Sequence, residues 1–190
     1  EAYDILYRAA WNYVHRSAAL FELACIDCRR GDFTAALEKL DESIGLNKGH
    51  TKALNFKTAI LRRLDNDIAA SNAETCLNDD KLDLFALIEY SHFENVSQQI
   101  EQFAVKAENI LDVVRDYMKA GFYEEALNAL GFDKSGSPLI LYYEGYILSR
   151  LGKDGTEFIQ KAEACETGYC FPAQRPRHHL LTISICIYKQ

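Results

Sequence analysis

The pair Cys25 and Cys28 is the spacing in this sequence that most directly suggests chemistry. A Cys-x-x-Cys pair holds zinc when a second ligand pair follows at suitable spacing, and it exchanges disulfides in redox proteins. No second pair with matching spacing follows here, and the pair falls inside a segment of helical periodicity. We therefore interpret the six cysteines as free thiols that serve as small apolar residues in a reducing compartment. We expect no metal and no cofactor, and a metal-binding module stays the alternative.

Side chains that could act as general acids or bases are scattered along the chain. They are Asp27, Glu89, Glu144, His15, His50 and His92. The sequence contains no Gly-rich phosphate loop, nucleophile elbow or HExxH motif. A hydrolase with paired carboxylates leaves little trace in a sequence, although 190 residues are few for the helical barrels that such enzymes use. We expect a protein that is not an enzyme.

Charge and composition narrow the classes of partner. The chain carries a net charge of −7, and its last basic residues, Arg175, Arg177 and Lys189, follow an acidic body. This balance argues against nucleic acid as a partner. No run of 18 uncharged apolar residues occurs, so we expect no membrane span. Hydrophobic residues make up 48% of the chain, which is enough to bury a core.

The first residues lack the basic start and the apolar run of a signal peptide. Together with the free thiols, this predicts a cytoplasmic location. The chain starts without Met and inside an expected helix over residues 3–16, which indicates a piece of a longer protein. Within that helix we expect Trp11 to pack against the segment that follows.

Residues 17–47 predict two amphipathic helices joined by a tight turn. Apolar residues of the second helix recur at helical spacing: Phe33, Ala36, Leu37, Leu40 and Ile44. Gly31 is expected to end the first helix, because glycine adopts the left-handed conformation common at helix C-termini. Asp32 is expected to start the second helix as a cap or first-turn acid.

The same pattern predicts four further hairpins along the chain. They cover residues 51–77, 82–103, 107–130 and 138–165. Turns are expected at Asp65, Gly121 and Gly152, in the position that Gly31 has in the first hairpin. The stretch 82–103 is the least regular; there we expect a helix over 82–92 with Asp80 as its cap. The tail 172–190 alternates apolar and polar residues at strand spacing, and a capping helix remains the alternative.

This organisation resembles the tetratricopeptide repeat. The matching features are Ala24, the turn Gly31-Asp32-Phe33, Ala36, the closing pair Leu46-Asn47, and the 34 residues from Gly31 to Asp65. Asp27 departs from a usual aromatic residue and Lys48 from a usual proline. The resemblance implies an all-α domain over residues 1–171. Its hairpins would stack as a right-handed superhelix, an α-solenoid that binds partners and carries no catalysis of its own.

Longer stretches resemble the repeat region of a bacterial family of large proteins that carry a β-rich N-terminal domain of unknown function. They are AWNYVHRSAALFELACIDCRRGDFTAALEKLDESIGLN, KALNFKTAILRRLDN, ETCLNDDKLDLFALIEY, YMKAGFYEEALNAL, PLILYYEGYILSRLG and YCFP. The resemblance covers roughly residues 9–172, with Lys81 in place of a usual proline and a tail that departs altogether. The β-rich part of that family is similar to carbohydrate-associated folds. The implied alternative is an accessory segment of a larger carbohydrate-processing protein.

In stacks of this kind the first helix of each hairpin lines the concave face. By register with the repeat, we predict a peptide-binding face made of Phe21, Arg29, Asn55, Arg62, Arg63, Arg115, Tyr142 and Tyr146. Arginines mixed with tyrosines suit an extended, partly acidic peptide. That segment would come from a protein or from another domain of the same chain. The alternative is that the tyrosines pack in the core and the arginines are solvated.

Overall fold

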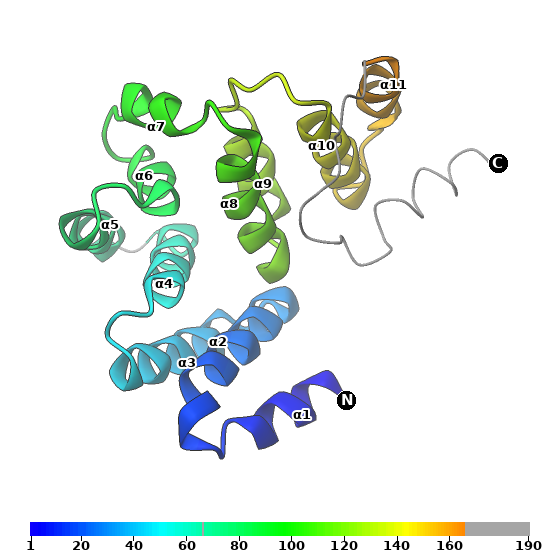
Figure 1. The fold of residues 1–190 in the computed structure, drawn as a ribbon. Helices are drawn as coiled ribbons and strands as arrows, with labels where there is room; N and C mark the ends of the chain where they lie inside the picture. Colours follow the sequence, from blue (N-terminus) through cyan, green and yellow to red (C-terminus); the bar gives the residue numbers. More distant parts are fainter. Residues whose placement is uncertain (66, 166–190) are drawn as a thin grey trace. The chain divides into compact units, whose positions relative to one another are not determined.

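A computed structural model describes residues 1–65 and 67–165, and its regular elements are all α-helices (Figure 1). The helices are α1 (Ala2–Ala9), α2 (Tyr13–Arg30), α3 (Phe33–Leu46), α4 (Thr51–Arg63), α5 (Ile68–Asp79), α6 (Leu84–Tyr90), α7 (Ser97–Phe103), α8 (Ala107–Ala120), α9 (Tyr123–Leu130), α10 (Pro138–Arg150) and α11 (Thr156–Ala164). The predicted all-α class is confirmed for this part of the chain. The strand or capping helix predicted for 172–190 lies outside the described residues.

The chain forms two compact units. Among the described residues, the first consists of residues 1–65, 67–100 and Asp116–Phe122, and the second of residues 101–115 and 123–165. Helix α8 therefore contributes residues to both units. In the first unit α2 packs on α3, α4 packs on α5, and α1 packs on α2; in the second unit α10 packs on α11 and on α9.

The four turn positions expected from the sequence all have left-handed backbone. Gly31, Gly121 and Gly152 have φ of 80°, 81° and 72°, and Asp65 has φ of 50°. Glycine adopts this region without a steric penalty, and aspartate is one of the few other residues that tolerates it. Each of the four residues follows the first helix of a predicted hairpin, so these turns set where the hairpins fold back.

Aromatic rings run through the core of the first unit. Phe21 of α2 meets Phe56 of α4 with ring centroids 5.3 Å apart, and Phe56 meets Phe85 of α6 at 5.5 Å. Phe85 meets Tyr117 at 4.4 Å, and Phe56 meets Phe122 at 6.3 Å. Aromatic pairs at these separations add to the stabilisation from burial alone. The rings tie the first helices of neighbouring hairpins together.

Three local predictions were wrong. The helix expected over residues 3–16 is interrupted, because α1 ends at Ala9 and α2 begins at Tyr13, four residues before the expected start of the first hairpin at residue 17. Helix α6 begins after Asp83, whose Oδ1 accepts a hydrogen bond from the Ala86 N–H at 3.1 Å, so Asp83 and not Asp80 is the cap. Trp11 does not pack against the first hairpin, because α1 ends at Ala9 and the Trp11 side chain is 77% exposed in the turn before α2. Within the described ranges, no helix has the length and apolar character that a membrane crossing requires.

Candidate interaction face

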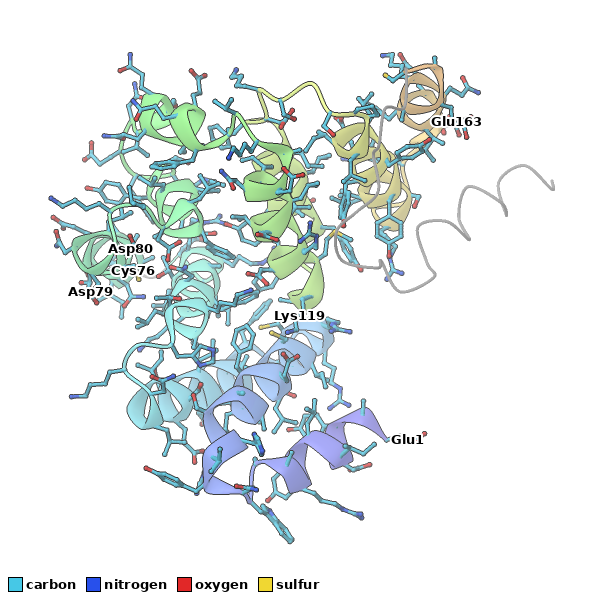
Figure 2. All side chains as sticks on the ribbon, viewed as in Figure 1. Glu1, Cys76, Asp79, Asp80, Lys119 and Glu163 are labelled. Atoms are coloured by element: carbon cyan, nitrogen blue, oxygen red, sulfur yellow. The ribbon has the colours of Figure 1, made fainter. Side chains whose placement is uncertain are left out.

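The side of α2 and α4 that carries Phe21, Arg29 and Arg63 is here called the A face. The chain's own residues Asp116–Phe122 lie against it. The Lys119 Nζ pairs with the Glu22 carboxylate, and the Arg29 Nε donates to the Lys119 carbonyl oxygen at 2.6 Å. Figure 2 shows Lys119 at the end of α8 that points toward α2. At Asp116, the first residue of the segment, the Lys52 Nζ lies 2.8 Å from the Asp116 Oδ2.

Aromatic and cationic groups complete the contact between the A face and this segment. The Arg63 guanidinium lies 4.8 Å from the centroid of the Phe122 ring, and the Lys119 Nζ lies 5.1 Å from the centroid of Phe21. A Cβ at Gly121 would lie 3.2 Å from the Cγ of Arg29, so the Arg29 side chain would have to shift by a few tenths of an ångström to admit it. Phe122 is 2% exposed.

This contact joins the first and second hairpins to the fourth. Its hydrogen-bonded residues are 64 to 97 positions apart in the chain. In a regular array of repeats, each unit contacts mainly its neighbours. No pattern in the sequence indicated this contact, because Lys119, Gly121 and Phe122 also fit the ordinary pattern of a helix end and a turn.

The predicted peptide-binding residues of the first unit all have partners within the chain. Phe21 and Asn55 are each 4% exposed, and the Asn55 Nδ2 donates to the Asp83 Oδ2 at 2.7 Å. These two side chains leave little surface for a partner. Arg29 and Arg63 are exposed but contact the segment Asp116–Phe122, and Arg62 pairs with Glu89. Peptide binding by this set stays a prediction.

The other three predicted residues belong to the second unit. The Arg115 Nε donates to the Tyr143 hydroxyl at 3.2 Å, and its Nη1 pairs with Asp112 at 2.5 Å. Tyr142 and Tyr146 lie half-buried on α10. Tyr143, which the prediction omitted, is 5% exposed and holds Arg115 in place. Peptide binding by these three residues is likewise untested.

A buried carboxylate links three helices of the first unit. Glu89 of α6 is fully buried; the Arg62 Nε donates to its Oε2 at 2.7 Å and the Tyr117 hydroxyl to its Oε1 at 2.5 Å. The three residues are 27 and 28 positions apart. In the sequence, Glu89 is one of several scattered acids. Its position within the apolar run LFALIEY is the feature that indicates burial.

The unusual Asp27 is also explained by a partner. Its side chain is 4% exposed and lies 2.8 Å from the Lys39 Nζ of α3. Partial burial alone would lower the pKa of Lys39, but the hydrogen bond and the charge of Asp27 outweigh it and raise the pKa. The ion pair thus links α2 to α3.

Cys25 and Cys28 are buried free thiols. Burial raises the pKa of each to about 12, so both thiols stay protonated at neutral pH and are poor nucleophiles and ligands. In the portion of the chain that the structure describes, no group of three or more His, Cys, Asp and Glu side chains is placed to hold a metal ion. Cys170 and Cys186 lie outside that portion.

A polar cluster joins α2, α3 and the start of α4. The Ser43 hydroxyl donates to the Ser17 carbonyl at 2.8 Å, and the Ser17 hydroxyl donates to the Ser43 carbonyl at 3.1 Å. The His50 Nδ1 lies 3.0 Å and 3.2 Å from these two hydroxyl oxygens. The two hydroxyl oxygens also lie 3.0 Å from each other, and which atom donates to His50 depends on the imidazole tautomer.

This cluster predicts a pH-dependent stability. Burial, and then the charge of Lys52, lower the pKa of His50. The unfolded chain therefore binds the proton more readily, and stability is lost as the pH falls from about 6.5 through the lower pKa of the folded state. We expect His50→Gln to cost more stability at pH 7.5 than at pH 5, measured by urea denaturation. The exposed His15→Gln is the control, and an equal cost of His50→Gln at both pH values would contradict the prediction.

Comparison with known proteins gives no further guide to this face. No family model matches the chain, and no curated protein is significantly similar to it. A functional proposal therefore depends on the helices and contacts described above.

Proposed function

We propose that this chain is a non-catalytic interaction scaffold of tetratricopeptide-like hairpins, which binds an extended segment on the A face. The hairpin bounds and the left-handed turns agree with that repeat. Side-chain hydrogen bonds also connect the first helices of successive hairpins: Arg62 of α4 to Glu89 of α6, Glu89 to Tyr117 of α8, and Arg115 of α8 to Tyr143 of α10. Stacking as a right-handed superhelix, and kinship with the bacterial family named above, belong to the same proposal.

The observation that carries the proposal is the segment Asp116–Phe122 on the A face. This face binds a cation through Glu22, a backbone carbonyl through Arg29, and an aromatic ring beneath Arg63. Charge-assisted hydrogen bonds and cation–π contacts are the means by which arginine-rich faces hold peptide segments. The docking is intramolecular in this chain, and a partner segment of the same chemistry would use the same groups. The buried thiols of Cys25, Cys28 and Cys76 support a reducing, cytoplasmic location.

Charge reversal on the A face tests the proposal. Arg29→Glu with Arg63→Glu removes both arginines that contact the segment, and Arg8→Glu with Lys106→Glu gives the same change in net charge on exposed residues elsewhere. We expect affinity capture from cells to recover a stoichiometric partner with the wild type and the control, but not with the A-face variant. A capture profile that is the same for all three proteins would contradict the proposal.

A further inference from the structure

A second surface of the first unit, distinct from the A face, contains a cavity of about 390 Å³ between α1, α2 and α3. Apolar and charged side chains line it together: Tyr7, Ala10, Trp11, Arg16, Leu20, Leu23, Glu38, Lys39 and Glu42. Its volume is within the range of sites that take a ligand or a large side chain. Its lining mixes apolar side chains with a few charged groups, as such sites commonly do.

Two exposed aromatic rings form one side of this cavity. Trp11 is 77% exposed and Tyr7 is 55% exposed, and their rings meet edge to face with centroids 6.3 Å apart. Large aromatic side chains left this exposed mark surfaces that bind something when they gather beside a cavity. Trp11 lies in the turn between α1 and α2 and does not join the aromatic core.

The charges in the cavity are largely paired, with one exception. Arg16 forms an ion pair with Glu42, and Lys39 forms one with the buried Asp27. Glu38 is exposed, and no partner for its carboxylate is found among the described residues. The two cations of the lining thus have acidic partners within the chain, while the Glu38 carboxylate of the same lining has none among the described residues.

We propose that this cavity binds an arginine side chain of a protein partner. The guanidinium would lie against the Trp11 and Tyr7 rings and would donate to the Glu38 carboxylate, while Leu20 and Leu23 would contact its methylene groups. Both the aromatic rings and the carboxylate favour a planar cation. Aromatic faces attract cations, and a carboxylate accepts two parallel N–H hydrogen bonds from a guanidinium. An acidic side chain would meet the unpaired Glu38 and is disfavoured.

The single tryptophan of the chain makes the test direct, since its fluorescence reports on this cavity. The probe is a blocked Gly-Arg-Gly tripeptide, and the control ligand is a blocked Gly-Glu-Gly tripeptide. We expect a saturable change in Trp11 fluorescence with the arginine peptide only. Glu38→Gln should weaken its binding about threefold to fivefold, the size of a partly exposed ion pair. Tyr7→Ala should also weaken the binding of the arginine peptide, as measured by the same change in Trp11 fluorescence.

Glu94→Gln, an exposed acid between α6 and α7, is the matched control and should bind like the wild type. The proposal is overturned by no saturable change with the arginine peptide, by an equal response to the glutamate peptide, or by unaltered binding in Glu38→Gln. Because the A-face variant leaves all lining residues in place, it should bind the tripeptide normally. A failure of the arginine-binding proposal can therefore be distinguished from a failure of the scaffold proposal.

Discussion

Replacing Glu89 with alanine is expected to lower the free energy of unfolding by about 3 to 5 kcal/mol, the usual cost of breaking a buried ion pair. Glu89 is fully buried, and it receives hydrogen bonds from Arg62 and from the Tyr117 hydroxyl. The variant would leave the Arg62 guanidinium, whose side chain is 18% exposed, without its carboxylate. It would also open a cavity between α4, α6 and α8. Urea denaturation followed by far-UV circular dichroism measures the loss.

A double-mutant cycle separates the ion pair from the cavity. Arg62→Met with Glu89→Met removes both charges and keeps most of the volume, so it should cost less than Glu89→Met alone. The exposed Glu94→Ala should change stability by less than about 0.5 kcal/mol. A loss of under about 1 kcal/mol for Glu89→Ala would show that the carboxylate does not hold the three helices together.

The parts of the fold that the sequence predicted are those set by local physics. Gly31, Gly121 and Gly152 mark turns because each turn requires a left-handed backbone, which glycine adopts without a steric penalty. Helical periodicity likewise indicated which stretches of the chain are helical, but α2 begins at Tyr13 rather than at residue 17. Trp11 was misplaced because its exposure depends on where α1 ends, which periodicity leaves uncertain by several residues.

The binding residues were harder to predict than the helices. The register of the repeat indicates which way a side chain points, but it does not indicate which residues contact that side chain. Phe21 and Asn55 are both buried, where Phe21 meets the Phe56 ring and Asn55 donates to Asp83. Arg29 and Arg63 meet Lys119 and Phe122 only through a contact between distant hairpins. Such pairings depend on how helices far apart in the chain come together. No spacing within one repeat encodes them.

A close backbone contact in the second unit gives the other large expected effect. Gly145 of α10 and Gly155 before α11 let the two helices touch. A Cβ at Gly155 would lie 2.3 Å from the Gly145 carbonyl oxygen and 2.8 Å from its Cα. These are backbone atoms, so the clash is relieved only if the helices separate. We expect Gly155→Ala to cost about 3 kcal/mol, the upper end of the usual range for overpacking.

Hydrogen exchange at the amides of α10 and α11 measures this loss locally, and we expect protection to fall in both helices. Backbone strain does not contribute, because Gly155 has φ of −108°, which alanine adopts freely. Gly45→Ala is the matched control: this glycine lies in α3 with no atom within 4 Å of its missing Cβ. Alanine there should raise stability by about 0.5 kcal/mol through helix propensity. Normal protection of α10 and α11 in Gly155→Ala would mean that these helices pack without the glycine contact, and that the hairpin owes its closure to Ile147, Ile159 and Ala162 alone.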